Sequence, residues 1–298
     1  MGRILVGTAS WTDESLIASG WYPEGTSSAE ARLAYYASRF PLVEVDSTYY
    51  FLPRRQTAQR WVERTPDGFT FNVKAFSLLT QHPTQPKALP SGMAPEGKRH
   101  VYLRHLDRRA IDEIWNLFTS ALAPLRRAGK LGGVLFQFPP WFTIKRDNKE
   151  YLAECAERAG PLRLCVEFRN AAWMRQPNRQ ETLQFLAQHR LAYVCVDTAR
   201  RTGSMPPVAA TTSPDLAVVR FHGRGRGGNG DDGDAQPEAV YSYTTRALRS
   251  WVPKLEALAA EAAVVHAVFR NVHRDFAPRS AERLRRLLEE RQSGLVTR

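Results

Sequence analysis

The chain has 298 residues, of which 43% are hydrophobic, and carries a formal net charge of +12 at pH 7. This length and composition allow one large buried core, so we expect a single domain over residues 1–298. No apolar run approaches the length of a membrane span, and the N-terminus lacks the charged and long apolar regions of a signal peptide. We therefore expect a cytoplasmic protein without membrane contact.

Arginine supplies most of the positive charge. Such a surplus attracts anions such as phosphorylated metabolites, nucleic acid or acidic surfaces. Because the arginines are spread through predicted helices as well as loops, the pattern favours an ordinary solvated surface over a dedicated nucleic-acid patch. Cys155, Cys165 and Cys195 lack metal-like spacing, which indicates buried thiols in a reducing compartment rather than a disulfide or a zinc site.

Eight segments have the character of β-strands, with alternating or short continuous apolar residues. They are residues 4–7, 43–46, 69–74, 134–138, 162–170, 192–197, 217–222 and 263–271. In the second segment Val43 and Val45 share one face, while Glu44 and Asp46 share the other. The pattern predicts strands that pack their apolar residues on one side and present polar side chains on the other.

Amphipathic helical segments separate almost all of these strands. They are residues 30–40, 57–64, 111–125, 149–158, 181–189, 248–262 and 281–288. Ser27 and Glu30 have the spacing of a capping box at the start of the first helix. Residues 77–107 are interpreted as a long loop with short helices, and such loops are often lids. Residues 198–214 are rich in Gly, Ser, Pro and Thr, so the helix after the sixth strand is predicted to be reduced or absent.

Alternating strands and helices predict a single α/β domain, a (β/α)8 TIM-type barrel with irregular loops. In such a barrel, residues of one parity pack on the helices and residues of the other face the barrel interior. A doubly wound open sheet is the alternative. That fold typically has a glycine-rich dinucleotide-binding motif after the first strand, and Gly7-Thr8-Ala9-Ser10 does not match it.

Active sites of these barrels lie at the carboxyl ends of the strands. The predicted catalytic residues there are Lys74, Glu167, Asp197 and His222, and the predicted substrate-binding residues are Ser10, Trp11, Glu44, Asp46, Tyr50, Gln137, Arg169, Arg220 and Asn271. Purely structural neutralisation is the alternative, with Glu167 paired to Arg169 or Lys74 and Asp197 paired to Arg220. His266 has the opposite parity to Asn271 and is expected in the core between barrel and helix.

The chemistry of these side chains suggests separate roles. Glu167 or His222 suits general acid or base catalysis, while Lys74, Arg169 and Arg220 suit the binding of a carboxylate or phosphate. The acids could hold a divalent metal, but the intervening cations argue against it, so we expect no metal and leave the cofactor unknown. The segment Gly223 to Gly233 is either a backbone anion cradle or a flexible surface loop.

The chain resembles the YecE-like proteins, which share the domain of unknown function 72. The motifs are Gly7-Thr8-Ala9-Ser10-Trp11, Trp21-Tyr22-Pro23, Val43 to Tyr50 with Pro53, Trp61 with Thr65-Pro66, Phe69 to Lys74, Gln137-Phe138-Pro139-Pro140, Val166 to Arg169 with Trp173, Arg220 to Gly223, and Phe269 to Asn271. The resemblance implies a TIM-type barrel related to the xylose-isomerase-like group, which includes sugar isomerases and an endonuclease for abasic DNA. It implies no established reaction. The family usually has two asparagines after Phe269, and here Arg270 takes the place of the first.

Three functions remain open at this point. The first is an enzyme, a hydrolase or isomerase, acting on a small anionic substrate such as a sugar phosphate or other phosphoester. The second is a nucleic-acid-binding or endonuclease-like protein that uses the basic surface and the loops around Tyr49, Trp141 and Arg224. The third is a barrel that binds a ligand without catalysis. The sequence does not indicate the oligomeric state.

Overall fold

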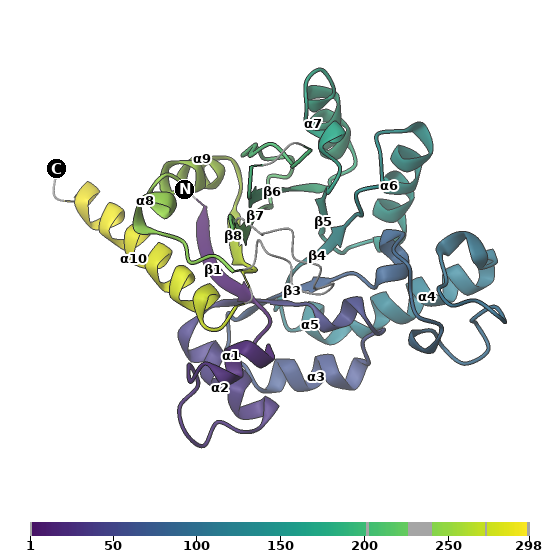
Figure 1. Cartoon of the computed structure of the whole chain (residues 1–298), viewed down its shortest axis with the longest axis horizontal. Helices are drawn as coiled ribbons and strands as arrows, with labels where there is room; N and C mark the ends of the chain where they lie inside the picture. Colours follow the sequence, from purple (N-terminus) through teal and green to yellow (C-terminus); the bar gives the residue numbers. More distant parts are fainter. Residues whose placement is uncertain (1, 201–202, 226–239, 272, 297–298) are drawn as a thin grey trace. The chain divides into compact units, whose positions relative to one another are not determined.

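The computed structural model describes residues 2–200, 203–225, 240–271 and 273–296 (Figure 1). Its eight strands follow one another around a closed barrel in the order β1 to β8. The strand pairs with a defined register are parallel, as in β3 with β4 and β7 with β8. The predicted TIM-type barrel is therefore confirmed.

The strands lie within a few residues of their predicted positions. They are β1 (Arg3–Ala9), β2 (Leu42–Val45), β3 (Thr70–Lys74), β4 (Leu131–Gln137), β5 (Leu164–Glu167), β6 (Ala192–Thr198), β7 (Leu216–Gly223) and β8 (Val264–Phe269). In the described residues between β6 and β7 there is no helix, as the composition of that segment predicted. Within the described chain, no helix is both long enough and apolar enough to cross a membrane.

Helices connect most of the strands. They are α1 (Glu14–Ala18), α2 (Ala29–Arg39), α3 (Arg55–Glu63), α4 (Arg108–Ala121), α5 (Ala123–Arg127), α6 (Arg146–Ala159), α7 (Asn178–Gln188), α8 (Thr245–Arg249), α9 (Val252–Glu261) and α10 (Phe276–Val296). Short 3-10 helices occupy the loops: η1 (Ser47–Tyr49), η2 (Ser77–Thr80), η3 (Pro86–Ala88), η4 (Leu103–His105) and η5 (Ala171–Trp173).

Three helix predictions needed correction. Residues 111–125 form α4 and α5, and residues 248–262 belong to α8 and α9, because Pro124 and Pro253 each stand in the first turn of a new helix. The N-cap of α2 is Ser28 rather than Ser27, and its hydroxyl accepts a hydrogen bond of 3.0 Å from the amide of Ala31. Helix α1 was not expected at all.

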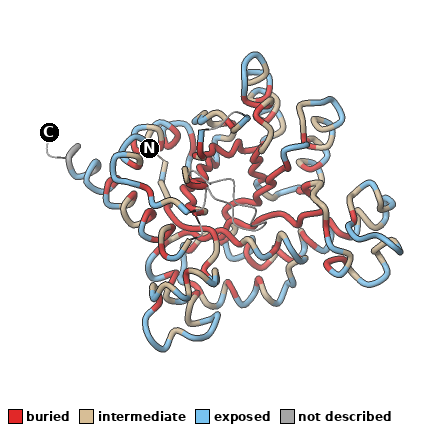
Figure 2. Tube along the Cα trace, viewed as in Figure 1, coloured by how far each residue is buried: buried red, intermediate tan, exposed pale blue. Residues whose placement is uncertain are grey.

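The chain divides into two compact units. The terminal unit comprises Met1–Val43 and Ala192–Arg298, and the central unit comprises Glu44–Leu191. In each unit the strands are largely buried, and the exposed residues lie mainly on helices and loops (Figure 2). The expectation of a single domain stays a prediction.

In the terminal unit, Tyr36 of α2 links two strand segments. Its hydroxyl accepts a hydrogen bond of 2.8 Å from the amide of Thr8 and donates one of 2.9 Å to the carbonyl of Leu42. A Cβ atom at Gly7 would lie only 1.9 Å from that same carbonyl oxygen, so glycine is required for the close approach. Helix α10, yellow in Figure 1, packs beside β1 and β8.

In the central unit, Lys130 closes the end of α3. Its ammonium donates to the carbonyl of Val62 at 2.9 Å, to the carbonyl of Thr65 at 2.6 Å and to the hydroxyl of Thr65 at 3.1 Å. Helix C-termini leave carbonyls without intrahelical partners, and a cation is favoured there by the helix dipole. Burial lowers the pKa of Lys130. The three hydrogen bonds replace those that the ammonium would make with water.

Candidate functional site

Ring contacts with the helices show which face of each strand points outward. The contacts are Phe71 of β3 with Trp61 of α3 at 5.9 Å, Phe136 of β4 with Trp115 of α4 at 5.7 Å, and Phe221 of β7 with Trp251, just before α9, at 5.2 Å between ring centroids. Because side chains alternate along a strand, the residues one or three positions from these phenylalanines face the barrel interior. These inward residues include Lys74, Gln137 and Arg220.

The central unit gathers four predicted site residues. The register pairs Gln137 with Glu167 and pairs Lys74 with Leu135, so Lys74, Gln137 and Glu167 share the inner face. The amide of Gln137 donates a hydrogen bond of 2.6 Å to Glu167 Oε1, and Arg169 Nε lies 3.2 Å from the same oxygen. Glu167 is fully buried. Glu167 and Arg169 thus form one of the ion pairs that the purely structural alternative contained.

Lys74 lies at the carboxyl end of β3, where its side chain is buried. Its Nζ lies 4.3 Å from the centroid of the Tyr49 ring, which is the arrangement of a cation–π contact. The hydroxyl of Thr48 donates a hydrogen bond of 2.6 Å to the carbonyl of Lys74. This bond ties η1 to the end of β3 and keeps the Tyr49 ring beside the ammonium.

His82 is a residue of this cluster that the sequence did not assign to the site. Burial is the largest cause that lowers its pKa to about 4, and the charges of Lys74 and Arg169 are the next largest. Both cations therefore act on one half-buried imidazole. The central unit brings together a neutral histidine, two cations and the Glu167 carboxylate.

The backbone around His82 is held by local hydrogen bonds. The amide of His82 donates to the carbonyl of Ser77 at 3.0 Å, and its Nδ1 lies 2.9 Å from the hydroxyl of Thr80. The same Thr80 hydroxyl lies 3.1 Å from the carbonyl of Ser77, so it links the imidazole to the backbone of η2. Gln81, with φ 60°, adopts the left-handed conformation that turns the chain there. Nothing in the sequence marks that turn, because left-handed positions usually carry glycine or asparagine.

Three further predicted residues lie on β2 and the turn that follows it. Glu44 is buried on β2. The strand ends at Val45, and Asp46 has helical backbone angles at the start of η1, so strand alternation does not decide the direction of its side chain. Tyr50 follows η1 and is 62% exposed.

In the terminal unit, Arg220 and His222 lie on the inner face of β7, and both are buried. His266 shares this face, because the register pairs it with Val218, two residues before Arg220. The expectation that His266 lies between barrel and helix is therefore wrong. Alternation shows which residues of a strand share a face, but it does not show which face is inside.

The predicted interior position of Asp197 is also wrong. The register pairs Asp197 with Phe221, which faces the helices, and pairs Val196 with Arg220. The Asp197 carboxylate accepts a hydrogen bond of 2.6 Å from Arg224 Nε, and also accepts bonds from Arg224 Nη2 and from the indole of Trp251. Asp197 and Arg220 thus face opposite sides of the β6–β7 pair.

The remaining predicted residues of the terminal unit follow strand ends. Ser10 comes directly after β1 with φ 64°, and its hydroxyl accepts a hydrogen bond of 3.1 Å from the amide of Thr12. Trp11 is buried. The amide of Asn271 donates a hydrogen bond of 2.7 Å to the carbonyl of Tyr241. The roles predicted for Ser10, Trp11 and Asn271 stay predictions.

The donor atoms bear on whether a metal fits. Within the described residues, no group of three or more His, Cys, Asp or Glu side chains could hold a metal ion. Glu167 and Asp197 instead accept from arginine, amide and indole donors. Burial raises the pKa of Cys165 and Cys195 to about 12, so these thiols stay protonated at neutral pH.

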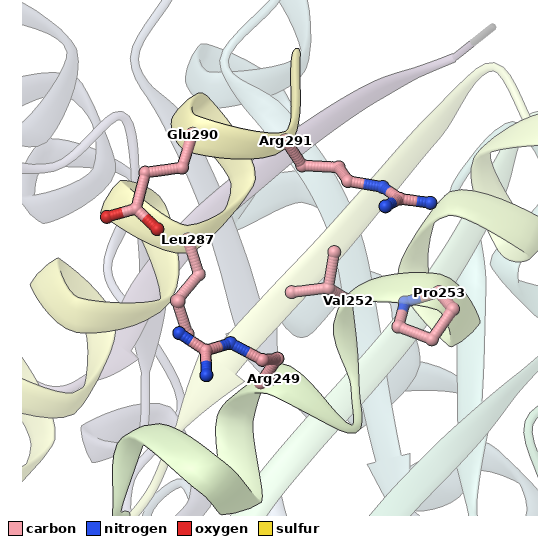
Figure 3. Close-up of a pocket in the computed structure, with 6 residues that line it drawn as sticks. All are labelled: Arg249, Val252, Pro253, Leu287, Glu290 and Arg291. Carbon is pink, nitrogen blue, oxygen red and sulfur yellow. The ribbon is translucent and has the colours of Figure 1, made fainter. Parts of the chain in front are cut away.

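Two further features belong to the terminal unit. A groove of about 340 Å³ runs between α10 and the α8–α9 segment, and its lining residues are Arg249, Val252, Pro253, Leu287, Glu290 and Arg291 (Figure 3). It is formed by helices and not by strand ends. Of the glycine-rich segment Gly223 to Gly233, only the first three residues belong to the described part of the chain, so the predicted anion cradle there stays a prediction.

The fold and these positions define a class: a TIM-type barrel with polar and charged residues on the inner face near the carboxyl ends of its strands. Residues 5–298 match the family model described as protein of unknown function DUF72, and the chain belongs to this family. The resemblance recognised in the sequence is thereby confirmed.

Individual relatives agree with this assignment. The chain is similar to UPF0759 protein YunF of Bacillus subtilis (strain 168), with 31% identity over 300 residues that cover 99% of this chain and 98% of YunF. Among solved structures it is similar to the DUF72 family protein EF0366 of Enterococcus faecalis V583, with 25% identity, a TM-score of 0.78 and 96% coverage of both chains. It is also similar to the DUF72 family protein TM1631 of Thermotoga maritima MSB8, with 27% identity, a TM-score of 0.77 and coverage of 96% and 99%.

Proposed function

We propose that this barrel is an enzyme that binds a small anionic substrate, such as a sugar phosphate or another phosphoester, and that Lys74 and Arg169 hold the anion. The observation that carries the proposal is the cluster of charges around Glu167: Lys74 shares its face of the sheet, and Arg169 Nε lies 3.2 Å from its Oε1. Burial and the charges of both cations lower the pKa of His82 to about 4. Two cations acting on one half-buried ring create a positive potential. A bound anion relieves that potential.

Charge and geometry suit the two cations to different parts of this task. The planar guanidinium of Arg169 offers several donors, and its Nε is beside Glu167 at 3.2 Å. The Lys74 ammonium is buried and acts as a point charge. Together they supply the donors that a phosphate group requires.

Glu167 is the general acid or base of the proposal. Its carboxylate is fully buried and receives a hydrogen bond from Gln137, which fixes its orientation. A buried, oriented carboxylate beside an anion-binding pair can move a proton to or from the bound ligand. The roles predicted for Arg220 and His222, on the inner face of β7 in the terminal unit, stay predictions.

Isothermal titration calorimetry with inorganic phosphate, ribose 5-phosphate and uncharged ribose tests the anion site. We expect both phosphates to bind and ribose not to bind. The change Lys74→Met removes a charged donor and should weaken phosphate binding by about 10- to 100-fold. The change Arg169→Gln should act in the same direction, and thermal melting of both variants checks that they are folded.

The matched control is Lys149→Met. Lys149 lies on α6 in the same unit and pairs with Glu181, so this variant removes the same charge away from the cluster. Its phosphate affinity should stay within about twofold of the original, since an exposed ion pair contributes little. Equal weakening by Lys74→Met and Lys149→Met would contradict the site, and so would an unaltered protein that binds neither phosphate.

A further inference from the structure

Four aromatic side chains form a continuous row in the central unit, which we call the aromatic row: Tyr50, Tyr49, His82 and Trp141. The ring centroids are 5.1 Å apart for Tyr50 and Tyr49, 5.3 Å for Tyr49 and His82, and 6.0 Å for His82 and Trp141. Each neighbouring pair meets edge to face. Residues from three separate loops therefore meet in one row, in which neighbouring rings are close to perpendicular.

The two ends of the aromatic row are open to solvent. Tyr50 is 62% exposed and Trp141 is 57% exposed. Together with Phe51, they are the large aromatic residues that are strongly exposed in the described part of the chain, and all of them follow β2 or β4. Exposing apolar surface of this kind to water costs free energy, and a ligand that covers the surface gains that free energy on binding.

The exposure of Trp141 does not come from a loosely held loop. Asn170 donates a hydrogen bond of 2.7 Å to the carbonyl of Pro140, and the indole of Trp173 donates one of 2.8 Å to the carbonyl of Phe142. Phe142 is buried against Phe138, with ring centroids 4.1 Å apart. The residues on both sides of Trp141 are thus fixed while its own ring is left in solvent.

The other rings of the row are held in the same manner. Thr48 ties the Tyr49 turn to the carbonyl of Lys74 at 2.6 Å, and Ser77 accepts from the amide of His82 at 3.0 Å. A surface fixed before a ligand arrives loses little conformational entropy on binding. The exposed ring of Trp141, at one end of the aromatic row, is therefore held in place for a flat partner to stack on.

The aromatic row is also adjacent to the proposed anion site. The Lys74 ammonium lies 4.3 Å from the Tyr49 ring, and the charges of Lys74 and Arg169 both act on His82. A free phosphate would use the charges and leave the rings exposed, and the small, puckered ribose of a sugar phosphate would cover less ring surface than a planar base. A ligand that uses both features carries a flat ring linked to an anionic group.

We infer that the ligand of this site is a nucleoside monophosphate, whose base stacks on Trp141 at the end of the aromatic row while its phosphate lies at Lys74 and Arg169. The inference rests on the proposed function, because the phosphate is placed by the same two cations. It adds that the base makes a nucleoside monophosphate bind more tightly than a sugar phosphate without a base. Stacking of a base on an aromatic side chain tolerates any base, because every base has a flat face.

Calorimetric titration with AMP, ribose 5-phosphate and adenosine separates the two parts of the ligand. We expect AMP to bind at least tenfold more tightly than ribose 5-phosphate. The change Trp141→Ala should weaken AMP binding by about tenfold and change ribose 5-phosphate binding by less than about twofold. Trp141→Phe keeps a flat ring and should restore most of the AMP affinity.

Leu117→Ala is the matched control, because Leu117 is an exposed apolar residue of α4 outside the aromatic row. It should leave all affinities unchanged, and circular dichroism should show every variant folded. Equal affinity for AMP and ribose 5-phosphate, or equal weakening of both by Trp141→Ala, would overturn the base-stacking inference and leave the anion site standing. Absence of binding by either phosphate would overturn both, and binding of a single-stranded oligonucleotide without binding of AMP would overturn the nucleoside monophosphate inference.

Discussion

At the scale of single residues, His82 gives the central cluster its character. It is a histidine kept neutral by burial and by two neighbouring cations. Its ordinary pKa is near neutrality, so the neutral form is stabilised in the folded chain relative to the unfolded chain. The stabilisation is fully present above about pH 6.5 and is lost as the pH falls toward about 4.

The first prediction concerns this titration. NMR titration of the His82 ring should give a pKa of about 4, and Lys74→Met should raise it because a repelling charge is removed. The variant His82→Asn identifies the signal. The free energy of unfolding should also fall more steeply between pH 6.5 and pH 4 in the unaltered chain than in His82→Asn. If the pKa of His82 is the same in Lys74→Met, the Lys74 ammonium does not act on the imidazole and the prediction is wrong.

The second prediction concerns Glu167. The change Glu167→Gln keeps the size of the side chain but removes its charge and its ability to exchange a proton. Phosphate affinity should change by less than about tenfold, while turnover of a responsive sugar phosphate or phosphoester should fall by about 100-fold or more. NMR product assays on a substrate panel measure both quantities. If turnover persists in Glu167→Gln, another residue acts as the acid or base and the prediction is wrong.

At the scale of elements, alternation predicted the strands well and their inward faces less well. In β3 and β4 the outward residues are aromatic and the inward ones polar, so composition and geometry agree. In β6 the inward residues include Val196. The outward Asp197 accepts a hydrogen bond from Trp251 and forms an ion pair with Arg224. Such partners come from distant parts of the chain, so the composition of a single strand does not predict which of its faces is inside.

The site shows the same limit. Glu167, Gln137 and Lys74 could be predicted because strand ends are recognisable and parallel strands carry their ends to the same edge. His82 could not, because it is placed by a left-handed turn at Gln81 and by hydrogen bonds to Ser77 and Thr80. Loops of this length have no periodicity from which a direction can be read.

The third prediction belongs to helix α3. Lys130→Met removes three donors to Val62 and Thr65 and leaves buried carbonyls without them. The free energy of unfolding should fall by about 1.5–3 kcal/mol, the usual range for a lost charged hydrogen bond. Urea denaturation measures it, with Lys149→Met as the control at less than about 1 kcal/mol. Equal small losses in both variants would mean that Lys130 does not close the helix.

At the scale of the whole molecule, the closed strand order and the two compact units lead to a fourth prediction. Ladder hydrogen bonds continue around all eight strands, so we expect the chain to unfold in one cooperative transition as a single domain. Differential scanning calorimetry should give one peak. Two separate peaks, with a protease-resistant fragment matching residues 44–191, would divide the chain into independently folding parts.

The net charge of +12 acts at the same scale. It attracts phosphorylated ligands toward the barrel whichever residues finally bind them. Nucleic-acid binding by this surface stays a prediction of the sequence. The proposed function depends instead on two particular cations among the many, and this makes the position of a bound anion decisive.

The most direct measurement is a crystal structure of the protein soaked with tungstate, an anomalous scatterer that mimics phosphate. The proposed site predicts a tungstate peak within hydrogen-bonding distance of both Lys74 Nζ and the Arg169 guanidinium, and no peak there in Lys74→Met crystals. Tungstate bound only at surface arginines such as Arg285 and Arg286, with the cluster around His82 left empty, would contradict it.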